Sequence, residues 1–109
     1  MRNCSKNDIV LIRYPFTDLS GSKVRPAVVV STPHLSEDIF IIPLTSKTSS
    51  LLAGEFVLKD WRDEGLSVPT AAKRGIHTVS SSLIAKRVGT LSASDATQLE
   101  SSLRAWLGH

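Results

Sequence analysis

The sequence is poor in several residue types that would point to a familiar class of protein. Among its 109 residues there is one cysteine, Cys4, and only 6% are aromatic. One cysteine excludes an internal disulfide framework and a cysteine-rich metal site. No apolar run reaches the ~18–20 residues that a transmembrane helix needs. Arg2 and Lys6 are followed by a strand-like stretch with Asp8 inside it, which is not a signal-peptide pattern. We therefore expect one cytoplasmic domain over residues 1–109.

Short catalytic motifs are missing as well. The sequence has no glycine-rich phosphate loop, no His-x-x-x-His or Cys-x-x-Cys spacing and no nucleophile elbow. The three histidines, His34, His77 and His109, are isolated from one another. We expect neither a bound metal nor another cofactor, and any chemistry must come from residues that folding brings together.

Acidic residues are absent from two stretches of a basic chain. The formal net charge is +3, with a sequence pI near 9.4. Residues 19–36 contain Lys23 and Arg25 but no acid, and residues 65–94 contain four cations without an acid: Lys73, Arg74, Lys86 and Arg87. If these segments meet on one face they attract a polyanion, whereas separately they are solvated loops. The charge pattern alone does not decide between these two interpretations.

The apolar pattern predicts strands first and a helix last. Runs of β-branched and aromatic residues predict strands over residues 8–14, 25–31, 38–45 and 55–58, with weaker ones near 67–72, 76–79 and 86–89. Residues 60–65 and 82–85 predict single helical turns. From residue 93 on, four apolar residues recur every three or four positions and predict one face of a helix: Ala96, Leu99, Leu103 and Trp106.

The helix also carries its own boundary signals. Ser92 with Asp95 forms an N-cap pattern, and Gly108 is a typical stop. Several strands with one terminal helix indicate a mostly β fold, either a small, strongly bent barrel or an α+β sheet.

Polar residues at two strand ends are the most informative chemical feature. Arg25 precedes an apolar strand and is followed by Pro26, which fixes the backbone there. Thr45 and Ser46 end the third strand and Lys47 follows. Where neighbouring strand ends meet, a guanidinium, hydroxyls and an ammonium can together grip a phosphodiester. The structural alternative is that Arg25 pairs with Asp8 or Asp18 while Thr45 satisfies a loop.

Residues 7–30 resemble the opening of PemK/MazF-family toxins. That family reads G-D-I-V-L, then P-F-T-D, then R-P-A-V-V-V, and the matching stretches here are residues 8–11, 15–18 and 25–30. The resemblance continues in order through residues 43–46, 61–65, 82–84 and 88–92, and it ends in the terminal helix. It therefore covers nearly the whole chain.

The resemblance implies a small SH3-like β-barrel that forms a homodimer. It also implies a metal-independent endoribonuclease, the toxin of a type II toxin–antitoxin pair, which cuts single-stranded RNA at short sequence motifs. Its catalytic pair corresponds to Arg25 and Thr45 here. The implied partners are an RNA substrate, a cognate antitoxin and, for the toxin–antitoxin complex, operator DNA. Further RNA contacts would come from strand ends and loops: Pro15, Phe16, Thr17, Lys23, Ser46, Lys47, Lys73, Arg74 and His77.

The sequence departs from the family pattern in one loop. Some members carry an arginine and a nearby aspartate where residues 72–77 lie, and here that segment has Lys73 and Arg74 but no acid. His77 is an alternative proton carrier, or else an ordinary core or surface histidine. The usual glycine before Asp8 is Asn7, which tolerates left-handed backbone geometry.

Three functions follow from different classes. The first is the RNA-cleaving toxin. The second is a nuclease-inactive module that binds antitoxin, RNA or operator DNA on the same fold. The third, an SH3-like adaptor for proline-rich peptides, needs an aromatic groove that a chain with 6% aromatic residues hardly supplies.

Overall fold

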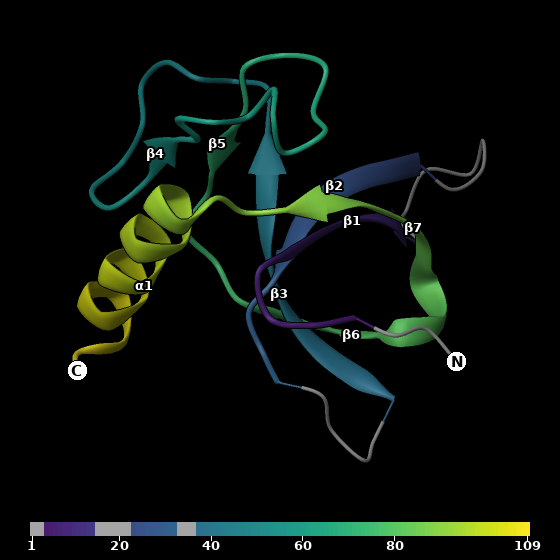
Figure 1. Ribbon diagram of the computed structural model, residues 1–109. Coiled ribbons are helices and arrows are strands. Elements are labelled where there is room, and N and C mark those ends of the chain that lie inside the picture. The colour runs from purple at the N-terminus through teal and green to yellow at the C-terminus, as the bar shows by residue number, and fades with distance from the viewer. Residues whose placement is uncertain (1–3, 15–22, 33–36) are drawn as a thin grey trace.

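The fold is a bent antiparallel sheet followed by one helix (Figure 1). The computed structural model describes residues 4–14, 23–32 and 37–109. The strands are β1 (Asp8–Tyr14), β2 (Lys23–Val29), β3 (Asp38–Thr45), β4 (Phe56–Val57), β5 (Ala71–Ala72), β6 (His77–Ser80) and β7 (Ile84–Thr90). A short 3₁₀ turn, η1 (Ser81–Leu83), precedes β7, and helix α1 (Ala93–Leu107) ends the fold.

The strand order is β4-β5-β3-β2-β1-β7, with β6 paired to β3 beside β5. All the ladders are antiparallel. No ladder joins β4 to β7 within the described part of the chain, so the strand path stays open although the sheet bends as a barrel does. The prediction of a mostly β fold with a C-terminal helix is confirmed.

Two apolar clusters cover the two faces of the central strands. Ile9 and Val28, which are paired across β1 and β2, belong to the cluster that Leu99 of α1 covers. The next pair, Val10 and Ala27, belongs to the cluster on the opposite face. Burial on both faces explains why the β2 sequence is a continuous apolar run rather than an alternating one.

Helix α1 begins and ends where the sequence predicts. The Ser92 hydroxyl accepts the Asp95 backbone N–H at 3.2 Å, and Gly108 adopts a left-handed conformation with φ of 79°. Asn7 also lies in the left-handed region, at φ of 76°, as the replacement of a glycine there predicts. The part of the chain that the structure describes contains no helix long and apolar enough to span a membrane.

The strand bounds differ from the predictions mainly around proline. The segment at 67–72 forms a ladder only at Ala71–Ala72, since Pro69 has no N–H to donate. Strand β2 begins at Lys23 rather than at Arg25, because β1 continues to pair with it as far as Tyr14. The predicted turn at 60–65 is present, and Gly65 takes a φ of 95° there.

Candidate functional site

A cleft opens where β2 and β3 stop pairing. Their ladder runs from Val29 opposite Ile41 to Ala27 opposite Pro43 and then ends. Pro26 and Pro43 both lack the N–H that would continue it. If the register were extended past this point, Arg25 would lie opposite Thr45. The two prolines therefore separate β2 and β3 next to Arg25 and Thr45, two positions that share a register.

The cleft has a volume of about 510 Å³, and Arg25 and Thr45 both line it. Its lining comes from β1, β2, β3, β7 and the segment before β5: Leu11, Val24, Arg25, Pro26, Leu44, Thr45, Ser46, Lys47, Gly65, Leu66, Ser67, Val68, Thr70, Lys86 and Val88. Of the predicted site residues, Ser46 and Lys47 also lie here. The structure thus brings four of them to one place.

The Thr45 hydroxyl is held in a defined orientation. Its oxygen accepts the backbone N–H of Lys47 at 3.1 Å, a local turn that fixes the side chain. A hydroxyl has one donor and two acceptor positions. With one acceptor position occupied, the O–H of this half-buried side chain can be donated to a ligand in the cleft.

The charged side chains that line the cleft are all positive among the described residues. Arg25 comes from β2, Lys47 follows β3 and Lys86 comes from β7, and the lining residues include no carboxylate, imidazole or thiol. Cations around a concave surface concentrate the local field and favour a polyanion. The lining therefore suits a phosphodiester and offers none of the side chains that usually hold a catalytic metal.

Asp8 has other partners than Arg25. Its carboxylate lies 3.3 Å from Arg87, accepts the Thr90 hydroxyl at 3.0 Å and accepts the Ser5 backbone N–H at 2.9 Å. These contacts fasten β1 to β7 at the far end of the sheet. The other suggested partner, Asp18, lies outside the described residues.

Three predicted RNA-contact residues, Lys73, Arg74 and His77, lie along the other edge of β3. The backbone N–H of Lys73 bonds to the Pro43 carbonyl, and His77 pairs with Ile41 at the start of β6. Both contacts are on the side of β3 away from β2. Lys73, Arg74 and His77 are therefore not among the residues that line the cleft.

A carboxylate does reach the acid-free 73–77 segment, but from elsewhere in the chain. Glu55 accepts the Leu52 backbone N–H at 2.8 Å and the Arg74 backbone N–H at 2.9 Å. These two bonds, foremost that from Arg74, lower the pKa of Glu55 below its usual 4.5, and the charges of Lys73 and Arg74 add to the effect. No short spacing could reveal this contact, because it forms only when the chain folds.

Four of the predicted RNA contacts lie at or beyond the limits of the described segments. Pro15, Phe16 and Thr17 lie outside the described residues. Lys23 is fixed only as a position in β2, opposite Tyr14. Conversely, Lys86 and the wall at 65–68 were missed as site residues. The acid-free stretch already contained Lys86, and its register opposite Leu11 supplies the missing placement.

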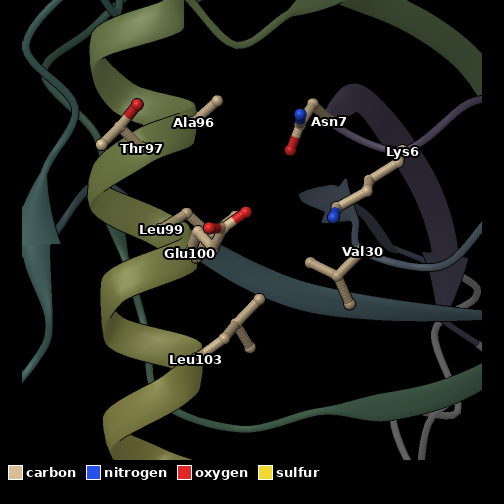
Figure 2. Close-up of a pocket in the computed structure, with 8 residues that line it drawn as sticks. All are labelled: Lys6, Asn7, Val30, Ala96, Thr97, Leu99, Glu100 and Leu103. Carbon is tan, nitrogen blue, oxygen red and sulfur yellow. The ribbon is translucent and has the colours of Figure 1, made fainter.

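A second hollow of about 190 Å³ lies between α1 and the segments flanking β1 and β2 (Figure 2). Lys6 and Asn7 line one side, and Leu99 and Glu100 of α1 line the other. It brings together no pair of site residues predicted from the sequence. The cleft between β2 and β3 is therefore the stronger candidate for function.

The structure is a small bent antiparallel sheet with a terminal helix and a cleft that cations line, and comparison with known families identifies the family to which it belongs. Residues 5–107 match the family described as the PemK-like, MazF-like toxin of type II toxin–antitoxin systems. The chain belongs to this toxin family, as the resemblance of residues 7–30 indicated. No curated protein matches the sequence closely.

Solved structures agree on the fold. A MazE–MazF structure from Deinococcus radiodurans superposes with a TM-score of 0.80 at 16% identity, covering 99% of this chain and 98% of the other. An endoribonuclease with its cognate antitoxin, from a mycobacterial species, gives 0.78 at 13% identity over 97% and 96%. A MazF toxin of Mycobacterium tuberculosis gives 0.74 at 20% identity over 93% and 96%.

Proposed function

We propose that the protein is a metal-independent endoribonuclease toxin, an mRNA interferase that cleaves single-stranded RNA at short sequence motifs. The observation that supports this most directly is the cleft in which Arg25 and Thr45 lie together with two lysines and no acid. Membership of the toxin family supports the reaction class, and the cleft lining supports the assignment of Arg25 and Thr45 to it.

The chemistry follows from what these side chains can do. The 2′-hydroxyl attacks the adjacent phosphorus, the 2′-O–P bond forms, and the bond to the 5′-oxygen of the next nucleotide breaks. One proton leaves the 2′-oxygen and one reaches the 5′-oxygen, so the products are a 2′,3′-cyclic phosphate and a 5′-hydroxyl. Negative charge grows on the non-bridging oxygens, where Arg25 can donate two parallel N–H bonds and Thr45 one O–H bond.

The same cleft suits the expected partners. A cognate antitoxin would neutralise the toxin by laying a flexible acidic segment along the cations, in place of RNA. Two of the similar solved structures are described as containing an antitoxin or MazE with the toxin. We further propose a homodimer, for which light scattering at micromolar concentration is the test, and operator DNA as a partner of the toxin–antitoxin complex.

One observation favours a second function. Within the described residues, 4–14, 23–32 and 37–109, the cleft lining carries no carboxylate or imidazole that could accept the proton of the 2′-hydroxyl. A nuclease-inactive module, binding RNA or antitoxin in the same cleft, would need only the cations. Cleavage with Arg25 and Thr45 alone relies on charge stabilisation and positioning, and it predicts a rate that rises with hydroxide concentration.

The deciding experiment incubates the purified protein with a long single-stranded RNA in EDTA and maps the cuts. We expect discrete cuts with cyclic phosphate ends, which Arg25→Ala abolishes. Arg104→Ala is the matched control, because this exposed arginine lies on α1 and pairs only with Glu100 among the described residues. Intact RNA after incubation with a folded wild-type protein would favour the binding module, and equal cutting by Arg25→Ala would refute the site.

A further inference from the structure

The least satisfied group in the described structure lies directly behind the cleft wall. Glu64 is only 2% exposed, and its Oε1 is buried without a hydrogen-bond partner. Its Oε2 accepts the backbone N–H of Ser92 at 2.7 Å. A buried carboxylate oxygen without a donor has lost its hydrogen bonds to water and has no protein hydrogen bond in their place. Such an oxygen is unfavourable when it is charged.

A second carboxyl group stands next to it. Asp95, also 2% exposed, accepts the backbone N–H of Lys59 at 2.9 Å and that of Asp60 at 3.1 Å. Carboxylate oxygens of Asp60, Glu64 and Asp95 lie within 4.8 Å of one another. Because Glu64 and Asp95 are buried and Asp60 is half-buried, negative charges on all three repel strongly unless one carboxyl is neutral.

We propose that Glu64 and Asp95 share one proton, carried on Glu64 and donated to Asp95, and that this bond holds the cleft wall against helix α1. Glu64 is then a positioning residue for the cleft rather than a catalytic one. The part of the proposal that concerns RNA rests on the proposed function, whereas the shared proton does not.

The surroundings favour the proton on Glu64. Both Asp95 oxygens already accept backbone N–H groups, which stabilise its charged form, while Glu64 has one such bond and one bare oxygen. Burial first, and then the hydrogen bond to Asp95, raise the pKa of Glu64 to about 7. Among the described residues, the charged groups close to its carboxyl are Asp95 on α1 and Asp60 one turn earlier, while on the β7 side its backbone carbonyl faces the uncharged Gly89.

The pair is mechanically connected to the cleft. Residues 65–68, which follow Glu64 directly, line the cleft, and Thr70 closes the segment by accepting the Leu58 backbone N–H at 2.8 Å. The wall is thus fastened at one end by this bond and at the other by the Glu64 carboxyl. Ionising Glu64 removes its bond to Asp95 and leaves the bond from the Ser92 N–H, so the wall is held less firmly without any change at Arg25 or Thr45.

The expected pH dependence has a definite sign. In the unfolded chain Glu64 loses its proton near pH 4.5, whereas in the folded protein it keeps it up to about 7. The contribution of Glu64 to stability is therefore fully present in acid, falls as the pH rises between these values and is constant above them. The ratio of folded to unfolded protein falls by on the order of 10²-fold across this range. RNA affinity falls as the pH rises towards 7, because residues 65–68 of the cleft wall are then held less firmly.

The test compares wild type, Glu64→Gln and Glu100→Gln in EDTA. Glutamine keeps the shape of Glu64, donates an N–H to Asp95 and does not titrate. Unfolding by urea is measured from pH 4.5 to 8.5, and the Glu64 carboxyl resonance is followed by carbon-13 NMR. KM and kcat for RNA are measured over the same range.

For the wild type we expect the free energy of unfolding to fall and KM to rise as the pH increases to 7. We expect kcat to increase with hydroxide concentration. Glu64→Gln should remove both the stability loss and the rise in KM, while the exposed control Glu100→Gln keeps them. A Glu64 resonance that titrates near 4.5, or equal stability profiles for wild type and Glu64→Gln, would overturn the shared proton. If the stability profile changes as expected but KM does not, the connection to the cleft is wrong. Absence of cleavage at every pH would refute the proposed function alone, since unfolding and NMR still report on the proton.

Discussion

Substituting Gly89 by alanine should show how closely the cleft wall approaches strand β7. A Cβ at Gly89 would fall 2.9 Å from the carbonyl carbon of Glu64 and closer still to its oxygen. Gly89 lies in β7 beside a register shift, and its φ is outside the left-handed region, so alanine adds no left-handed backbone strain there. The only way to accommodate the methyl group is to move the Glu64 backbone away from β7.

The size of the effect follows from that displacement. Ordinary carbon–oxygen contact requires the two backbones to separate by about 1 Å, which is enough to forfeit a quarter to a half of the contact energy between them. Overpacking of this kind costs about 3 kcal/mol, the upper end of the usual range, because rigid backbone has to move. At an unfolding entropy of about 2.1 cal/mol/K per residue, this lowers Tm by about 13 °C.

Thermal and urea unfolding measure this directly, with Lys86→Ala as the control on the same strand. Lys86 is exposed, so its loss should change stability by less than about 0.5 kcal/mol. Gly65→Ala tests the same contact from the turn. Its Cβ would lie 2.7 Å from the Val88 carbonyl oxygen, and its φ of 95° disfavours alanine in addition. A Gly89→Ala protein as stable as the control would refute the close approach and, with it, the idea that the turn lies firmly on β7.

Three further changes test other parts of the structure. Lys86→Ala should weaken binding of a non-cleavable RNA analogue and reduce the slope of log affinity against log salt by about 0.7, measured by fluorescence anisotropy at several salt concentrations. Glu55→Gln should speed hydrogen exchange at the Arg74 amide at pH 7. Because the pKa of Glu55 is lowered, its contribution to stability is present above about pH 4.5 and is lost as the pH falls through the folded value, so the variant and the wild type should converge in acid. Ser92→Ala should cost about 1 kcal/mol of unfolding free energy, the usual effect of losing an N-cap, measured by urea unfolding.

Local signals explain why most elements could be predicted from sequence. Strands β1 and β3 coincide with their predicted bounds, and α1 differs by a single residue, because β-branched runs and a helical period are carried by neighbouring residues. The same holds for the cap at Ser92. The short β5 was overestimated, because Pro69 limits the ladder more than the surrounding apolar residues extend it.

The cleft could be predicted only in part. Arg25 and Thr45 were recognisable as polar residues beside apolar runs, although Arg25 lies within β2 rather than at its end, and the β2–β3 register explains why the two positions meet. Lys86 and the Glu64–Asp95 contact depend on the order of strands and on where the 60–65 turn lies, and neither is encoded in a short spacing. The N-cap illustrates the difference: the Ser92 hydroxyl was predictable, whereas the carboxylate that accepts the Ser92 N–H is that of Glu64, not of Asp95.

Two backbone features therefore bound the cleft on opposite sides: prolines that end a ladder and glycines that allow a close approach. On one side, Pro26 and Pro43 end a ladder and let two strands diverge. On the other, Gly65 and Gly89 have no side chain to keep the 60–65 turn away from β7. The backbone approach that these glycines permit also buries Glu64 beside Asp95. A buried acid next to a basic cleft is thus a consequence of the same packing, and this is why a proton far from Arg25 can affect how the cleft binds its ligand.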